Sequence, residues 1–292
     1  MVFFRMPAPA DTPTDDLSPE ALEYIKTLTK LHARFTVLSE RTPVNRKAYV
    51  FIGRGGGGLS GNAKYLFLHM ARKHPEVESW FLTESLDDYK ALRQANLPVL
   101  FYPDEVTIHK LAEAGTVVVE SISFRRALYM PLLAKARQVQ LWHGVGNKKI
   151  GFQLANVPVL EGRTDNLVAD HSDYDIIVTT SPFYTEEVFK KSMDAKEFLD
   201  YGYPRTDIFR SRVNADALLG CDTAAYAAVR AARKKGWKVL LYAPTFRDTE
   251  ITPLTLDAFN LLDFFDLLKK HRIHLILKPH PRVPMKAPGL PE

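Results

Sequence analysis

From Ala48 onward the sequence alternates between short apolar segments and longer amphipathic ones, with glycine-containing or polar turns between most of them. Residues 63–74 and 86–96 have the apolar spacing of helices that pack on a sheet. Strands that alternate with helices are typical of a parallel sheet covered by helices on both faces. The sequence therefore predicts an α/β fold. Its expected strands are 48–52, 78–84, 99–103, 116–121, 139–144 and 175–180.

A second strand–helix series begins near Glu197, with apolar segments at 197–203, 238–244 and 274–281. The chain has 292 residues, and a domain usually takes roughly 150, so we expect two domains, divided within 185–197. The second series offers few strands before a Pro-rich end, whereas a complete doubly wound domain has about five or six. We therefore expect the C-terminal domain to be incomplete.

The N-terminal region divides into a leader and a helix. Residues 1–17 are rich in Pro, Asp and Thr and are expected to be disordered. Ser18 and Pro19 then form a helix start, and the helix is expected within 18–44. One side carries apolar residues and the other Lys26, Lys30 and Arg34. Two interpretations remain open: an amphipathic helix packed on the body, or a basic helix on an anionic membrane.

Composition limits the partners and the type of site. The net charge of +5 favours an anionic partner such as a nucleotide, a phosphopolymer or an acidic membrane surface. Acidic residues are interleaved with the basic ones, so nucleic acid is not expected. Cys221 is the single cysteine, which excludes internal disulfides and a Cys-rich zinc site. No apolar run approaches the roughly 20 residues that cross a bilayer, and no signal peptide is recognisable, so a cytoplasmic protein is expected.

The loop after the first predicted strand is unusually rich in glycine. Gly53, Gly55 and Gly58 match the G-x-G-x-x-G pattern of dinucleotide-binding proteins. The acidic residue at the end of the second strand, Glu84, lies further along than the usual spacing of about 20 residues. A nicotinamide or flavin enzyme is one interpretation. A glycine-rich turn that lets the loop approach another ligand is the other.

Four segments that follow predicted strands combine a turn residue with a side chain suited to phosphate chemistry. Because parallel strands present their carboxyl ends at one edge, these segments are expected to face a ligand. A histidine there can take a proton from an attacking hydroxyl, and Arg, Lys or protonated His can stabilise phosphate charge. The alternative for each is a structural hydrogen bond. The candidates are His143, Gly144, Arg205, Thr245, Arg247, Lys278 and His280.

Taken in order, the segments LWHGVGNKKIG, GYPRTDIF, LYAPTFRD and LKPHP resemble the CDP-glycerol glycerophosphotransferase family of teichoic-acid primases and polymerases. GLSGNAKYLFLHM, which contains Asn62, is similar to the first loop and helix of that family. The resemblance implies a GT-B fold, in which two Rossmann-like domains face each other across a cleft. Residues 45–190 would form the acceptor side and 191–292 the donor side. Nothing after Pro281 matches the later Ser- and Asp-rich segment of the family.

The resemblance also implies site roles. His143 would be the general base and His280 a second catalytic residue. Substrate would be bound by Asn62, Gly144, Arg205, Thr245, Arg247 and Lys278.

The implied reaction moves a polyol phosphate, glycerol phosphate first, from a CDP-polyol donor to a lipid-linked or polymeric acceptor, with release of CMP. The enzyme would work peripherally on the inner face of the cell membrane. No cofactor is predicted. Mg²⁺ is compatible with a diphosphate donor, but no carboxylate cluster indicates a site. Three alternatives stay open: a GT-B glycosyltransferase that uses a nucleotide sugar, an NAD(P)-dependent oxidoreductase, and an inactive scaffold.

Overall fold

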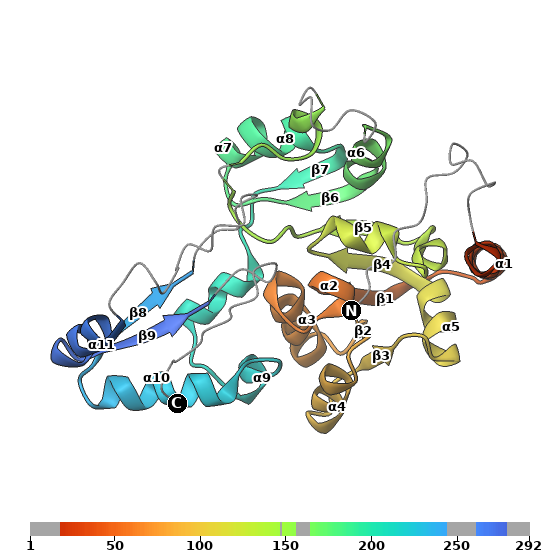
Figure 1. Cartoon of the computed structure of the whole chain (residues 1–292). Helices are drawn as coiled ribbons and strands as arrows, with labels where there is room; N and C mark the ends of the chain where they lie inside the picture. Colours follow the sequence, from red (N-terminus) through yellow and green to blue (C-terminus); the bar gives the residue numbers. More distant parts are fainter. Residues whose placement is uncertain (1–17, 147, 156–163, 244–260, 279–292) are drawn as a thin grey trace. The chain divides into compact units, whose positions relative to one another are not determined.

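The computed structural model describes residues 18–146, 148–155, 164–243 and 261–278 (Figure 1). The chain divides into two compact units, Met1–Gly220 and Cys221–Glu292.

The first unit is built on a parallel sheet of seven strands in the order β3-β2-β1-β4-β5-β6-β7 (Figure 1). Val50 of β1 pairs with Trp80 on one side and with Val117 on the other. The strand order reverses direction between β1 and β4, so the carboxyl ends of these two strands form a switch point. This sheet confirms the predicted α/β class. The strands are β1 (Asn45–Ile52), β2 (Glu78–Thr83), β3 (Val99–Phe101), β4 (Ala114–Val119), β5 (Arg137–Gln140), β6 (Tyr174–Val178) and β7 (Ala195–Leu199).

Helices cover both faces of this sheet. Helices α3 (Gly61–Lys73) and α4 (Leu86–Gln94) pack on the face that carries Phe51 and Phe81, while α1 (Pro19–Arg41) and α5 (Glu105–Glu113) pack on the other. The remaining helical segments are short: α2 (Arg54–Gly57), η2 (Ile122–Arg126), η3 (Met130–Leu133), η4 (Gly151–Leu154), α6 (Thr164–His171), α7 (Pro182–Tyr184), η6 (Thr185–Phe189), α8 (Lys190–Ser192), η7 (Pro204–Arg210) and α9 (Ala215–Leu218).

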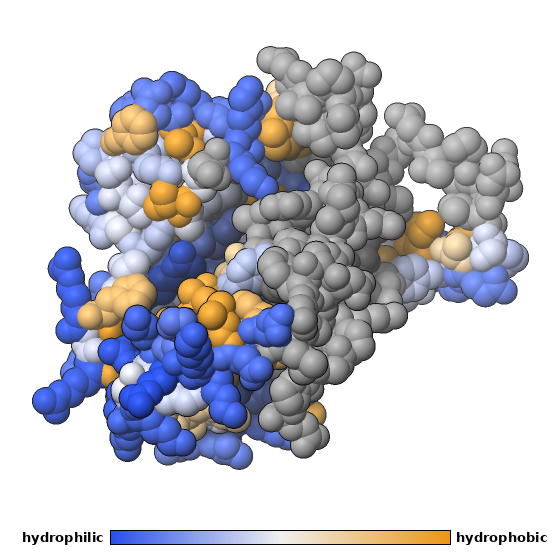
Figure 2. All heavy atoms as spheres, turned by 60° about the vertical axis from the view of Figure 1, so that its left-hand side comes forward, coloured by the Kyte–Doolittle hydropathy of each residue, from blue (hydrophilic) through white to orange (hydrophobic). Residues whose placement is uncertain are grey.

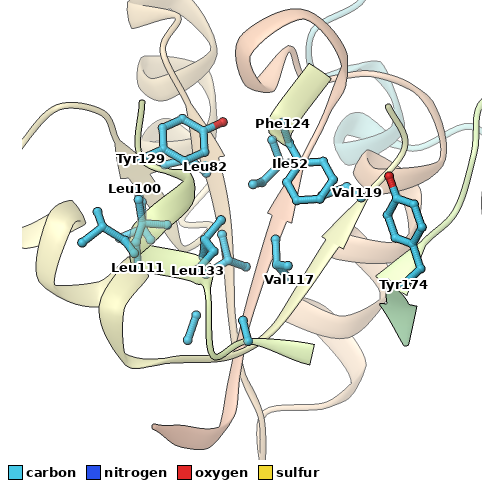
Figure 3. Packing of buried hydrophobic residues seen from close by; sticks show 14 of the residues in the cluster. Ile52, Leu82, Leu100, Leu111, Val117, Val119, Phe124, Tyr129, Leu133 and Tyr174 are labelled. Carbon is cyan, nitrogen blue, oxygen red and sulfur yellow. The ribbon is translucent and has the colours of Figure 1, made fainter. Parts of the chain in front are cut away.

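The larger hydrophobic cluster lies on the α1 and α5 face of the sheet (Figure 3). Val50, Val117 and Leu133 are fully buried there, and Tyr129 closes the cluster with its ring edge toward Tyr102. The alternation of side chains along a strand explains the division, since Phe51 and Val118 point to the opposite cluster. The sheet is thus a buried platform whose strand ends are fixed in place.

Strand β7 corrects one sequence-based grouping. The segment near Glu197 was expected to open the second series, but β7 pairs with β6 through Tyr174 and Ala195 and forms the edge of the first sheet. Its burial is only partial, with exposed Lys196 and Glu197. An edge strand of this composition carries too little apolar signal to show which sheet it joins.

The second unit contains α10 (Thr223–Lys234), β8 (Lys238–Tyr242), α11 (Leu261–Lys270) and β9 (Ile273–Leu277). Strands β8 and β9 pair in parallel, with Leu240 opposite Leu275. Asp222 caps α10 by accepting a hydrogen bond from the backbone N–H of Ala225. The predicted strand–helix–strand order of this region is confirmed within the described residues.

Helix α1 begins where the sequence predicted, with the Ser18 hydroxyl accepting from the N–H of Ala21 and Pro19 as the first helical residue. Its C-terminal half packs on the sheet unit: Phe35 is buried, and the Ser39 hydroxyl donates to the Leu132 carbonyl. The packed interpretation of this helix is confirmed for that half. Among the described helices, none combines the length and the apolar character needed to cross a membrane.

Helix α3 is joined to α9 by a buried lysine. Lys64 is 2% exposed, and its ammonium group donates to the carbonyl oxygens of Ala217 at 2.7 Å and Leu219 at 2.5 Å. A buried ammonium group is tolerated because these acceptors replace water. Arg72, at the other end of α3, forms an ion pair with Asp216 at 2.8 Å. The last helix of the first unit is therefore fixed to α3.

Candidate active site

The candidate site lies past the carboxyl ends of β1, β4 and β5, at the switch point of the sheet. Strand β5 ends at Gln140, which leaves His143 in the loop that follows. The Gln140 side chain accepts a hydrogen bond from the backbone N–H of Trp142 at 2.9 Å and so turns the chain sharply. Trp142 has a positive φ of 54°. The local geometry therefore turns the chain at the strand end and leaves His143 half-buried.

The His143 ring is held in one tautomer. Its Nδ1 lies 3.0 Å from the backbone carbonyl oxygen of Glu120. A carbonyl oxygen only accepts, so Nδ1 carries the proton and Nε2 keeps a lone pair. The Trp142 ring stacks on the imidazole at 4.4 Å between centroids. These contacts give His143 the orientation that a general base needs.

Burial lowers the pKa of His143 below its ordinary value of 6.5, and the positive charges of Arg54 and Arg205 lower it further. The hydrogen bond to Glu120 opposes this shift. A neutral imidazole is the form that accepts a proton. The surroundings of His143 therefore favour the basic form near pH 7.

Asn62 connects two of the predicted segments. It is fully buried at the start of α3, its side-chain amide donates to the carbonyl of Trp142 at 2.8 Å, and its oxygen accepts from the N–H of Arg205 at 3.3 Å. The loop that carries His143 and the loop that carries Arg205 are thus both hydrogen-bonded to the side chain of Asn62. These contacts are to protein, and the substrate-binding role of Asn62 stays a prediction.

Gly144 and Arg205 lie side by side. Arg205 Nη2 is 3.4 Å from the position that a Cβ on Gly144 would take. The guanidinium group also lies over the ring of Tyr203, whose hydroxyl donates to the Gly144 carbonyl at 3.2 Å. The structure therefore brings together four of the predicted residues: Asn62, His143, Gly144 and Arg205.

Glu120 is a site residue that the sequence analysis missed. It directly follows β4 and is fully buried. One carboxylate oxygen accepts from the backbone N–H groups of Asn62 at 2.5 Å and Ala63 at 3.2 Å, while the other has no hydrogen-bond partner among the described residues. Burial raises the pKa of Glu120, and the two N–H donors oppose that rise. A charged residue at the end of the run TVVV was the available signal.

The Glu120 carboxylate occupies the first turn of α3. In dinucleotide-binding proteins the pyrophosphate takes this position, at the N-terminus of the helix that follows the glycine-rich loop. Here the loop also forms the short helix α2, and Gly58 ends α2 rather than starting α3. A Cβ on Gly61 would overlap the carboxylate. This arrangement disfavours the oxidoreductase interpretation of Gly53, Gly55 and Gly58.

The other predicted residues belong to the second unit, and three of them fall outside the described residues. Lys278 is exposed at the end of β9 in the second unit, where its backbone N–H donates to the Tyr242 carbonyl at 2.9 Å. Thr245, Arg247 and His280 fall outside the described residues. Within the described part of the chain, no group of three or more His, Cys, Asp or Glu side chains could hold a metal ion.

Comparison with known proteins shows a family, curated relatives and solved structures to which the chain is similar. The family model described as CDP-Glycerol:Poly(glycerophosphate) glycerophosphotransferase matches residues 34–288. The teichoic acid poly(glycerol phosphate) polymerase of Bacillus subtilis is 25% identical over 230 residues, which cover 77% of this chain and 29% of the relative. The teichoic acid ribitol-phosphate primase of Bacillus spizizenii is 28% identical over 255 residues, which cover 81% of this chain and 61% of the relative.

A solved structure of the wall teichoic acid polymerase TagF has the same fold. Its TM-score is 0.62 at 19% sequence identity, and the match covers 89% of this chain and 63% of that chain. The chain thus spans less than two thirds of the length of each of these three proteins.

Proposed function

The chain belongs to the CDP-glycerol:poly(glycerophosphate) glycerophosphotransferase family, and on that premise we propose that it transfers a polyol phosphate from a CDP-activated donor. Glycerol phosphate is the first candidate for the transferred group. The acceptor is a hydroxyl of a lipid-linked or polymeric cell-surface molecule, and CMP is the second product. The relatives named as teichoic acid polymerase and primase support this assignment.

The observation that supports it best is the orientation of His143. Its Nδ1 is committed to the Glu120 carbonyl, Nε2 has a lone pair, and its pKa is lowered by burial and by two arginines. A base of this kind can take the proton of an attacking hydroxyl.

In the proposed step, an acceptor hydroxyl attacks the β-phosphorus of the donor. A new O–P bond forms between the acceptor and the polyol phosphate, and the bond from that phosphorus to the oxygen of CMP breaks. The hydroxyl proton passes to Nε2 of His143, and CMP leaves with the electron pair of the broken bond. Fixed cationic groups stabilise the charge that develops on the phosphate oxygens.

We assign the cationic groups on the donor side to Arg247, His280 and Lys278, with Thr245 as a further donor contact. This follows the family resemblance of their segments. The same resemblance supports a GT-B arrangement with residues 45–190 on the acceptor side and 191–292 on the donor side. It would give Arg205 to the donor, but the contacts of Arg205 with Asn62 and Gly144 group it with His143 instead. We also propose that the enzyme works at the inner face of the cell membrane, with the exposed Lys26 and Lys30 of α1 toward anionic lipid.

Calorimetric titration of the full chain tests the donor. CDP-glycerol, CDP-ribitol, UDP-glucose and NADH are titrated in separate experiments. We expect a CDP-polyol to bind, and we expect no binding of UDP-glucose or NADH. Binding of UDP-glucose instead would support a nucleotide-sugar glycosyltransferase. Binding of none of the four would contradict the transferase proposal and leave the scaffold interpretation.

The His143→Ala variant tests the base. General base catalysis contributes about 10²- to 10⁴-fold, so transfer of labelled glycerol phosphate should fall by at least about 100-fold. Donor binding, measured by the same calorimetry, should stay near the wild-type value. His109→Ala is the matched control, because His109 is exposed on α5. Turnover of His143→Ala within a few-fold of wild type would remove His143 as the base.

A further inference from the structure

Two arginine side chains beside His143 form no hydrogen bond or ion pair within the part of the chain that the structure describes. Arg54 is the first residue of α2, directly past the carboxyl end of β1, and Arg205 begins η7 with Pro204. Neither guanidinium group forms a hydrogen bond or ion pair with another described residue; Arg205 only lies over the Tyr203 ring. Both act as positive charges on the same two groups, the His143 ring and the Glu120 carboxylate. Strand β1 pairs with β4 and β4 pairs with β5, so Arg54 and His143 both follow strands that end at one edge of the sheet. Arg205 Nη2 lies beside Gly144, the residue after His143. The two arginines therefore belong to the same edge of the sheet.

The surroundings of the two arginines have room for a ligand. A Cβ added to Gly55, next to Arg54, would meet no atom within 4 Å. The same holds for Gly146, three residues after His143. Arg54 itself is exposed. The backbone next to Arg54 and the loop that follows His143 thus each border open space.

The charge balance of this place is positive. Glu120 is the carboxylate that faces both arginines, and it is fully buried with one oxygen already bound to two backbone N–H groups. Two guanidinium groups thus face one carboxylate, of which one oxygen is engaged by backbone N–H groups and the other has no hydrogen-bond partner among the described residues. Arginine is the side chain best suited to bind phosphate, because its N–H groups match two phosphate oxygens.

We propose that Arg54, together with Arg205, binds a phosphodiester group of the acceptor beside His143. This inference rests on the proposed function and adds a substrate-binding residue to it. In a polyol-phosphate acceptor, the terminal hydroxyl and the nearest phosphodiester are separated only by the carbons of one polyol unit. A phosphate held by Arg54 and Arg205 would therefore place that hydroxyl near Nε2 of His143, which is the positioning that accelerates a two-substrate reaction.

The diphosphate of the donor is the other phosphate group that Arg54 and Arg205 are suited to bind. Arg54 lies on the unit that also carries the candidate base, and the base must contact the acceptor hydroxyl. The N-terminus of α3, the other anion site of this loop, is occupied by Glu120. Both observations favour the acceptor phosphodiester, rather than the donor diphosphate, as the group that the arginines bind.

The test measures binding to the full chain by calorimetry, with a short synthetic oligo(glycerol phosphate) as the acceptor probe and CDP-glycerol as the donor probe. The variants are Arg54→Ala, Arg54→Lys and the control Arg46→Ala. Arg46 is exposed at the opposite end of the same strand, so its variant makes the same change of charge far from the site. Glycerol serves as the neutral probe.

We expect Arg54→Ala to weaken binding of the oligomer by about tenfold, the value for one lost charged hydrogen bond. Arg54→Lys should recover part of the loss, and Arg46→Ala should bind as the wild type does. Binding of CDP-glycerol should be unchanged in all three variants. Unchanged oligomer binding in Arg54→Ala would overturn the proposal, as would no oligomer binding by the wild type. A loss confined to CDP-glycerol would also overturn it, since Arg54 would then belong to the donor.

These outcomes separate the subsite from the proposed function. If the chain binds the oligomer through Arg54 but transfers no glycerol phosphate, the subsite stands and the transferase proposal fails. If the chain transfers glycerol phosphate and Arg54→Ala leaves the KM for the acceptor unchanged, the subsite fails and the transferase proposal stands.

Discussion

At the scale of single residues, the chemistry of the site depends on the surroundings of His143. The backbone of Glu120 fixes its tautomer, while burial and the arginines lower its pKa. An exposed histidine would be partly protonated near pH 6.5. His143 therefore stays neutral over a wider range of pH than an exposed histidine.

This predicts the pH dependence of turnover. Because the basic form is neutral, activity rises as pH increases through the pKa of His143, and the lowered pKa places this acid limb below pH 6.5. Removing a nearby positive charge makes the protonated ring less unfavourable, so Arg54→Ala should move the acid limb to higher pH. The measurement is the pH profile of kcat/KM for both proteins. An acid limb that moves to lower pH in the variant would contradict the electrostatic account.

The sequence predicted His143, Gly144 and Arg205 at this place because each stands beside a turn residue after an apolar strand. Glu120 escaped prediction for a physical reason. A carboxylate after a strand is usually a solvated side chain, and its role depends on the first turn of α3, about 60 residues earlier in the chain. Arg54 stands within a run of glycines, and the fold of the loops decides that its charge acts on His143 and Glu120.

At the scale of elements, the first turn of α3 requires glycine. Gly61 has a φ of 66°, and a Cβ there would overlap the Glu120 carboxylate. Gly202 has a φ of 85°, but a Cβ there would meet nothing within 4 Å. The two glycines share a backbone conformation and differ in what surrounds them.

Replacing each glycine by alanine separates the free-energy cost of the left-handed backbone from the cost of overpacking against Glu120. Gly202→Ala should lower the free energy of unfolding by about 1–2 kcal/mol, the cost of a left-handed conformation for an L-residue. Gly61→Ala should lose a further ~1–3 kcal/mol through overpacking against Glu120. Urea unfolding of the wild type and both variants measures the difference. Equal losses would show that the carboxylate moves aside without cost.

Element positions were predictable where the apolar pattern was strong, as for β1, β2, α3 and α4. The pattern was less informative at the sheet edge and in short turns. It did not indicate α2, since four residues with three glycines have little helix propensity. The pairing of β7 with β6 is a non-local contact, and the periodicity of residues within a strand does not specify its partner.

At the scale of the whole molecule, the net charge is +5. Among the residues that Figure 2 colours, hydrophilic surface predominates, with separate hydrophobic patches. On α1, Lys26 and Lys30 are exposed, whereas Arg34 forms an ion pair with Glu105 at 2.8 Å. The two lysines are therefore available to an anionic surface.

The double variant Lys26→Glu and Lys30→Glu tests membrane attachment by α1. Each lysine near an anionic surface contributes about 1 kcal/mol, so the variant should bind phosphatidylglycerol vesicles at least about tenfold more weakly in sedimentation. Lys234→Glu with Lys235→Glu, exposed in the second unit, makes the same change of net charge. Equal losses in the two double variants would mean that net charge, rather than α1, governs the binding.

The carboxylate of Glu120 also affects which dissolved anions can bind at the first turn of α3. A helix start that binds a free anion exchanges it with phosphate, sulfate or nucleotide according to their concentrations in the cell. Here the anion is part of the chain, and its effective concentration at the first turn of α3 is set by the fold alone. A free phosphate, sulfate or nucleotide would therefore have to displace Glu120 before it could bind at that helix end.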